Sequence, residues 1–166
     1  MKDGYRLYRF SVRRRKLREE GPIYRTQDPS TVADLFRKEL SKGHQDREHF
    51  YVFHLNVKNV VVGVDCVAIG SDESVDVSPK TVFRSALLSG ASALVIAHNH
   101  PSGDESPSPD DIHLTVRLRN AGIILGIPVL DHVIVTEDGL FSFRQEGMVL
   151  RTEDEEWSCS GVLIAE

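Results

Sequence analysis

The chain has 166 residues, of which 40% are hydrophobic and 27% charged, enough for one globular domain with a sizeable core. Its formal net charge of -5 argues against nucleic-acid binding by the chain as a whole, and its two cysteines form neither a disulfide framework nor a paired zinc-ligand pattern. No segment has the apolar character of a signal peptide or a membrane span, so a cytoplasmic protein without membrane contact is expected.

Charge is distributed unevenly along the chain. Residues 1–18 are rich in arginine and lysine, whereas residues 153–156 are all acidic. A basic arm of this kind can contact the phosphates of a nucleic acid, and it can equally be a solvated chain terminus. The basic residues considered for such a contact are Arg13, Arg14, Arg15 and Lys16.

Three helices are predicted, because a capping side chain stands directly before a proline at three places. These pairs are Asp28-Pro29, Ser78-Pro79 and Ser108-Pro109. The capping oxygen can accept a hydrogen bond from an unpaired backbone N–H of the first turn, and proline suits the first helical position, which needs no donor. Apolar residues recur behind each pair at helical spacing, and Gly122 is expected to end the third helix.

Strands are predicted around these helices. The apolar or alternating segments are residues 49–57, 60–70, 92–98 and 132–143, the last turning back at Asp138-Gly139. This order of elements favours one α/β domain with a mixed β-sheet flanked by helices. We expect the domain to span residues 28–147, after a basic N-terminal extension over 1–27 and before an acidic C-terminal tail over 148–166.

Two histidines stand at the end of the third predicted strand, in the segment HNHPSGDESPSPDD. Residues two apart in an extended chain point to the same face, so His98 and His100 are expected to project side by side. Imidazole is a common ligand of zinc and similar metals. Polar strand ends also carry such pairs without any metal, so the pair alone leaves both interpretations open.

Ser108 and Asp111 occupy the N-cap and third positions of the predicted helix, which is the spacing of a capping box. Helix capping alone would explain both residues. The positive end of the helix also favours an ionised Asp111 carboxylate, which suits a third metal ligand. Two imidazoles and one carboxylate leave the fourth position of a tetrahedral zinc ion to water, as in catalytic sites. Glu48, just before the first strand, is the candidate general base.

Three features together resemble the JAB1/MPN metalloprotease domain, also called JAMM, and within it the RadC-like bacterial branch. They are Glu48 before a strand, the motif His98-x-His100 followed after seven residues by Ser108-x-x-Asp111, and the segment LGIPVLDHVIV. The resemblance covers roughly residues 47–147, and every motif position is occupied. It implies a cytidine-deaminase-like layered fold and a zinc-dependent peptidase or isopeptidase.

The resemblance also implies a role for each residue of the motif. His98, His100 and Asp111 would bind one zinc ion per chain. Glu48 would act as general base and then donate the proton to the leaving amine. Ser108 would hydrogen-bond the oxyanion, in addition to capping the helix or in place of it. The implied substrate is a peptide or protein, ubiquitin-like proteins included.

Asp131 and His132, in the LDH part of the resembling segment, are expected to support the metal ligands from behind. An aspartate at a strand start and a half-buried histidine without any such role would have the same sequence.

Functions of other classes stay open. RadC-like proteins carry a DNA-repair label, so the alternative is a DNA-associated accessory protein that binds nucleic acid through its basic arm. A metal-stabilised binding module without catalysis is a third possibility. The letters HNH also name a class of nucleases, but that signature is spread over a ββα-metal unit, so the match is one of letters only.

Overall fold

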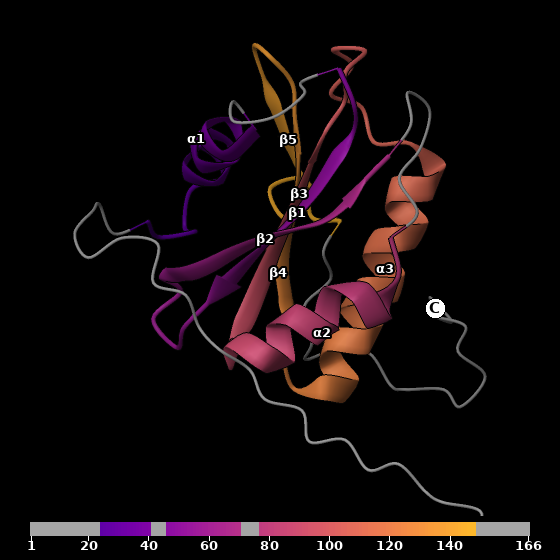
Figure 1. The fold of residues 1–166 in the computed structure, drawn as a ribbon. Coiled ribbons are helices and arrows are strands. Elements are labelled where there is room, and N and C mark those ends of the chain that lie inside the picture. Colours follow the sequence, from indigo (N-terminus) through magenta and orange to yellow (C-terminus); the bar gives the residue numbers. More distant parts are fainter. Residues whose placement is uncertain (1–23, 41–45, 71–76, 149–166) are drawn as a thin grey trace, which may run out of the picture.

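The computed structural model describes residues 24–40, 46–70 and 77–148 (Figure 1). Two charged segments lie outside the described residues, namely the basic run Arg13, Arg14, Arg15 and Lys16 and the acidic run 153–156. The predictions made for these segments and for the domain boundaries therefore stay predictions. Among the described helices, none combines the length and the apolar character needed to cross a lipid bilayer.

A five-stranded mixed sheet forms the middle layer, in the order β2-β1-β3-β4-β5. The strands are β1 (His49–Leu55), β2 (Val61–Ile69), β3 (Ala93–Asn99), β4 (Val129–Val135) and β5 (Leu140–Ser142). β3 and β4 run parallel, and all other neighbours are antiparallel. The predicted α/β class with a mixed sheet is confirmed, and so is the hairpin at Asp138-Gly139, which joins β4 to β5.

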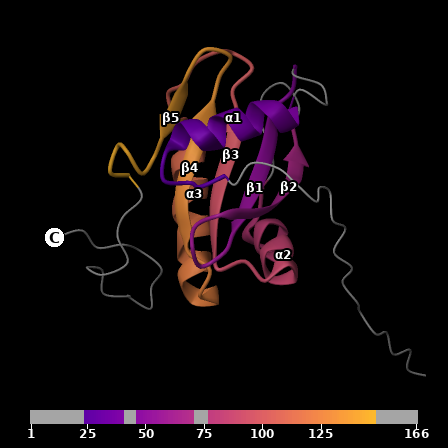
Figure 2. The same cartoon turned by 90° about the vertical axis from the view of Figure 1, so that its left-hand side faces the viewer.

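Helices cover both faces of this sheet (Figures 1 and 2). Helix α1 (Pro29–Leu40) lies on one face, and α2 (Pro79–Ser89) and α3 (Pro109–Leu125) lie on the other. Every residue of β3 is buried, and its side chains alternate between two cores. Val95 and Ala97 belong to the core beneath α1, whereas Leu94 and Ile96 belong to the core beneath α2 and α3. The carboxyl end of β3 is therefore withdrawn from water.

The three helices begin at the predicted prolines because each preceding side chain accepts a backbone hydrogen bond. The donor–acceptor distances are 2.9 Å from Ser30 N to Asp28 Oδ1, 3.3 Å from Thr81 N to Ser78 Oγ and 3.1 Å from Asp111 N to Ser108 Oγ. Each bond satisfies a donor that the first helical turn leaves without an intrahelical partner. The position of each helix start is thus fixed by local sequence.

The end of α3 differs from the sequence prediction. Gly122 lies inside the helix, which continues to Leu125 and ends at Gly126 with a left-handed φ of 66°. A Cβ on Gly122 would lie 2.6 Å from the Ile127 carbonyl oxygen and 3.3 Å from Cζ of Phe83. Gly122 therefore permits the close approach of α3 to the segment leading into β4, and the chain needs Gly126 to end the helix.

Replacing Gly122 by alanine tests this close approach. Because the added Cβ would collide with a backbone carbonyl, we expect Gly122→Ala to lose about 1–3 kcal/mol of unfolding free energy despite alanine's higher helix propensity. Urea denaturation measures the loss. The control Arg117→Ala changes an exposed side chain on the same helix and should stay within about 0.5 kcal/mol of the wild type. An unchanged midpoint for Gly122→Ala would contradict the tight packing.

Candidate metal centre

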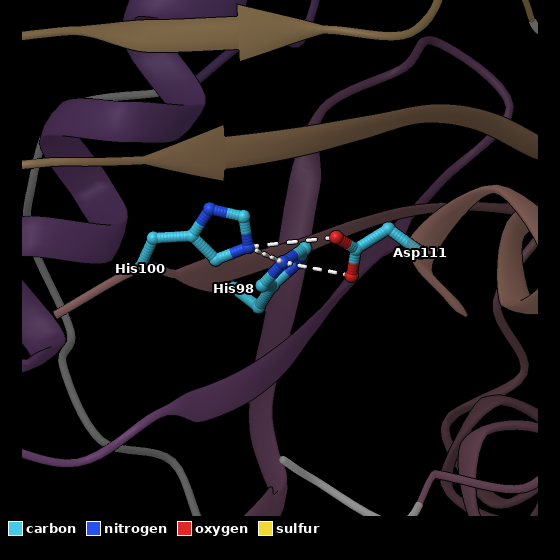
Figure 3. Close-up of side chains that lie close together, drawn as sticks. All are labelled: His98, His100 and Asp111. Carbon is cyan, nitrogen blue, oxygen red and sulfur yellow. Dashed lines mark hydrogen bonds and ion pairs between the residues drawn. The ribbon is translucent and has the colours of Figure 1, made fainter. Parts of the chain in front are cut away.

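Two imidazole rings meet at the end of β3 (Figure 3). The His98 side chain is fully buried, and the His100 side chain just beyond the strand is 17% exposed. Their Nε2 atoms lie 2.9 Å apart. The prediction that residues two apart would project side by side is confirmed. A pair of ring nitrogens this close favours a positive charge beside them, either a proton or a metal ion.

Asp111, in the first turn of α3, completes a three-residue cluster. Its Oδ1 lies 3.1 Å from His98 Nε2, and its Oδ2 lies 3.5 Å from His100 Nε2 (Figure 3). One ligand atom from each of the three residues lies within 4.8 Å of the other two. The structure thus brings together the three residues that the sequence motif singled out, and the donor set of two imidazoles and one carboxylate fits zinc.

The Asp111 carboxylate is oriented by the helix cap. Oδ2 accepts hydrogen bonds from Ser108 N at 2.8 Å and from Ser108 Oγ at 2.6 Å. Burial opposes ionisation, but the contacts with His100 and His98 and the hydrogen bond from Ser108 outweigh it and hold the pKa of Asp111 well below its ordinary value. Asp111 is therefore an anion, and Oδ1 is the oxygen that the capping box leaves for a metal ion.

The His100 ring is held by the loop that follows it. Its Nδ1 lies 2.7 Å from the Asp104 carbonyl oxygen, which can only accept, so Nδ1 carries a hydrogen. The Asp104 side chain in turn accepts from Ser106 N at 2.8 Å and does not enter the cluster. The hydrogen bond to Asp111 raises the pKa of His100, which shows that the cluster attracts positive charge.

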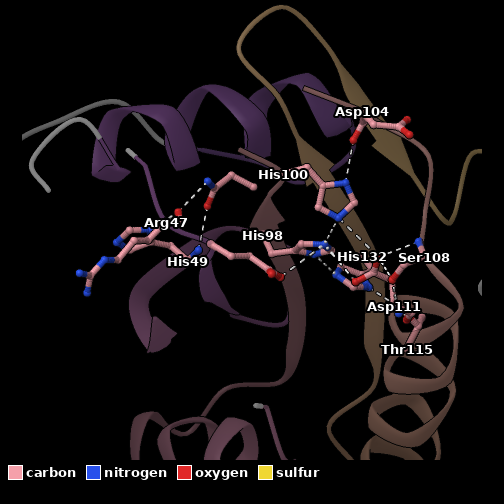
Figure 4. Close-up of polar contacts among 11 residues, drawn as sticks. Arg47, His49, His98, His100, Asp104, Ser108, Asp111, Thr115 and His132 are labelled. Carbon is pink, nitrogen blue, oxygen red and sulfur yellow. Dashed lines mark hydrogen bonds and ion pairs between the residues drawn. The ribbon is translucent and has the colours of Figure 1, made fainter. Parts of the chain in front are cut away.

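Behind His98 lies a chain of buried hydrogen bonds (Figure 4). His98 Nδ1 lies 2.8 Å from His132 Nε2, and His132 Nδ1 lies 2.6 Å from Thr115 Oγ1. Thr115 donates to the Asp111 carbonyl oxygen at 2.6 Å. Burial holds the pKa of His132 well below its ordinary value, so the ring is neutral. The sequence singled out His132 but missed Thr115, although its place one helical turn after Asp111 puts both on one face.

Asp131 does not support the metal ligands, contrary to the sequence prediction. Its carboxylate accepts hydrogen bonds from Ser142 Oγ at 2.8 Å and from Arg144 N at 3.0 Å. Neighbouring residues of a strand point to opposite faces, so Asp131 and His132 cannot both reach His98. Asp131 instead fixes the chain that follows β5.

Glu48 reaches the cluster from the start of β1. Its Oε1 lies 4.0 Å from His98 Nε2, and its side chain is 18% exposed. Burial raises the pKa of Glu48 above its ordinary value. The pairing of Phe50 with His98 in the β1–β3 ladder brings Glu48 to this end of the sheet, and sequence alone could not have shown that pairing.

Asn99, between the two histidines, was assigned no role from the sequence, yet it holds the backbone on both sides of Glu48. Its Oδ1 accepts from His49 N at 2.8 Å, and its Nδ2 donates to the Arg47 carbonyl oxygen at 2.9 Å. The side chain is buried, so both bonds are shielded from water. The position of Glu48 relative to the histidines therefore depends on Asn99.

A cavity of about 550 Å³ lies on the α1 side of the sheet, and His100 is the cluster residue that lines it. His100 forms part of its wall, together with Arg37 and Leu40 of α1, Gly103 of the loop and Glu137 after β4. A pocket of this size accommodates one or two residues of a peptide.

Comparison with known proteins identifies relatives of the chain. A family model of the RadC-like JAB domain matches residues 26–148. A UPF0758 protein of Desulforudis audaxviator is 45% identical over 127 residues, which are 76% of this chain and 54% of that protein. A UPF0758 protein of Moorella thermoacetica is 42% identical over 147 residues, which are 89% of this chain and 59% of that protein. The chain thus spans somewhat more than half the length of these relatives.

The ligand cluster predicts metal binding. We expect the metal-stripped chain to take up about one zinc ion, because three ligand atoms already converge. His98→Ala should bind far less zinc, as measured by calorimetric titration and elemental analysis. The matched control is His113→Ala, which removes an exposed histidine from the same helix as Asp111 and should bind zinc like the wild type. A wild-type chain that takes up no zinc would count against the site.

Proposed function

Because the chain belongs to the RadC-like JAB domain family, we propose that it is a zinc-dependent hydrolase that cleaves peptide or isopeptide bonds. The observation that carries this proposal is the convergence of His98, His100 and Asp111 at one strand end, with the Glu48 carboxylate 4.0 Å from His98 Nε2. Three ligands and an adjacent carboxylate that is not a ligand form the arrangement that metal-assisted hydrolysis requires.

The ligand set supports a catalytic site in preference to a closed structural one. His98 Nε2, His100 Nε2 and Asp111 Oδ1 supply three donors, so a tetrahedral ion would keep one position for water or substrate. A bound zinc ion would lower the pKa of a water molecule and polarise the substrate carbonyl. The residues around it would fix the ligands, exclude bulk water and move protons.

Glu48 is the proposed general base. Its Oε1 would accept the proton of the attacking water and later deliver it to the leaving amine. Burial raises the pKa of Glu48, which makes its carboxylate a stronger base than an exposed glutamate. The two hydrogen bonds of Asn99 to the flanking backbone keep this carboxylate in place during the transfer.

Ser108 has a demonstrated local contact and a proposed catalytic one. In this structure its hydroxyl donates to Asp111 Oδ2 and accepts from Asp111 N, so it caps α3 and orients a ligand. To stabilise an oxyanion, as proposed from the resemblance, the hydroxyl would have to turn from Asp111 toward the substrate. The same rotation would leave Oδ2 with the Ser108 backbone N–H as its remaining cap partner.

The proposed substrate is a peptide or protein chain, ubiquitin-like proteins included. The cavity that His100 lines on the α1 side provides room for a side chain of the substrate. It is lined by a cation, Arg37, by an anion, Glu137, and by the apolar Leu40. It therefore suits a side chain that has an apolar stem and a polar end.

Glu48→Gln separates metal binding from hydrolysis. We expect it to keep one zinc ion and to lose at least about 100-fold in hydrolysis, because the amide cannot accept the water proton. A panel of fluorogenic peptides and isopeptide-linked ubiquitin-like conjugates, assayed with wild type and variant side by side, measures the loss. Glu146→Gln, which changes an exposed glutamate after β5, is the control and should keep full activity. Full activity of Glu48→Gln would refute the proposed base.

Nucleic-acid binding through the basic arm remains a second proposal, supported by the run from Arg13 to Lys16. Since phosphate contacts release counterions, any complex with duplex DNA should weaken steeply as salt rises. A gel shift at low salt that disappears on deletion of residues 1–18 would support this proposal. A full chain that gives no shift at low salt would rule it out.

A further inference from the structure

We infer that Thr115 and His132 are positioning residues that fix the proton of His98 on Nδ1 and so present its Nε2 lone pair to a metal ion. The inference rests on the proposed metal-dependent function and adds to it two residues outside the ligand motif. It starts from the buried chain that runs from the Asp111 carbonyl through Thr115 and His132 to His98 (Figure 4).

The direction of each proton in this chain follows from one fixed end. A backbone carbonyl can only accept, so the single hydroxyl hydrogen of Thr115 goes to the Asp111 oxygen. Thr115 Oγ1 must then accept from His132, which places the hydrogen of the His132 ring on Nδ1. The ring is fully buried, which favours its neutral form, and with the hydrogen on Nδ1 its Nε2 carries a lone pair.

His98 is the last member of the chain. Because His132 Nε2 accepts, His98 Nδ1 must donate, and in the neutral ring, the form that binds a metal ion, the other nitrogen of His98 carries no hydrogen. That nitrogen is the one that lies 3.1 Å from Asp111 Oδ1 and 2.9 Å from His100 Nε2. Only a ring nitrogen without a hydrogen can bind a metal ion.

The same series of hydrogen bonds connects two proposed ligands, Asp111 and His98. Asp111 supplies a carboxylate oxygen to the cluster, and its own backbone carbonyl is the fixed end that sets the tautomer of His98. β4 contributes His132, which is held between the rings of Phe50 and Phe143 at centroid distances of 5.6 and 4.8 Å. The ring of His132 therefore has little freedom to turn and find another partner.

Thr115 is the position at which this inference can be tested without removing a ring. Thr115→Val keeps the shape of the side chain but offers His132 Nδ1 no acceptor. The His132 hydrogen is then better placed on Nε2, where it donates to His98 Nδ1. The hydrogen of His98 consequently moves to Nε2, the nitrogen that should bind the metal. Thr115→Ser keeps the hydroxyl and is the matched control.

Histidine nitrogen NMR on the metal-free full chain measures the tautomer directly. We expect the hydrogen of His98 on Nδ1 in the wild type and in Thr115→Ser, and on Nε2 in Thr115→Val. Thr115→Ala, which also removes the acceptor, should behave like Thr115→Val and replaces it if the valine variant does not fold. A His98 hydrogen that stays on Nδ1 in a folded variant without the hydroxyl would overturn the inference.

Zinc titration of the same proteins supplies the second measurement. Loss of an outer hydrogen-bond partner of a ligand typically weakens metal binding about 10-fold to 100-fold, and we expect this loss in Thr115→Val but not in Thr115→Ser. Equal zinc affinity in wild type and Thr115→Val would also overturn the inference. Neither readout uses hydrolysis, so failure of the proposed hydrolase function would appear separately, as a wild type that binds zinc but cleaves no substrate in the panel.

Discussion

The contact between His98 at the end of β3 and Asp111 at the start of α3 is the interaction on which the rest of the centre depends. It joins a fully buried strand to a helix N-terminus across 3.1 Å, and the second histidine lies 2.9 Å from the first. Two imidazoles beside a buried carboxylate are costly to desolvate unless a positive charge joins them. A metal ion in this position would therefore stabilise the fold at the same place where it would do chemistry.

The ligand motif was predictable from the sequence because its two halves obey local rules. The spacing of His98 and His100 follows from the two-residue repeat of a strand, and the spacing of Ser108 and Asp111 follows from the capping box. Both rules act within four residues, so neither depends on the rest of the fold. The three helix starts were predictable for the same reason, since cap and proline specify them locally, and the α/β class followed from the order of the predicted elements.

The remaining parts of the centre depend on pairings between distant segments, which local rules do not reveal. Glu48 could be named as a candidate base from its place before the first strand, but only the family resemblance linked it to the histidines, because its position rests on the β1–β3 register. Thr115 was missed because its partner, His132, comes from β4. Asp131 was wrongly expected to support the metal ligands together with His132, although neighbouring residues of a strand face opposite sides of the sheet. Gly122 was taken for a helix end, but glycine is needed there because the Ile127 carbonyl and Phe83 pack closely against α3.

Strand alternation also explains why one strand end can place both the ligands and the base. His98 and His100 turn toward α3, so the residue between them points to the other side. Asn99 uses that position to hold the backbone before and after Glu48. A slip of β1 against β3 by one residue would break both bonds of Asn99 and turn Glu48 away from the histidines. The amide of Asn99 therefore links the register of the sheet to the distance between base and ligands, and it does so without contributing a ligand itself.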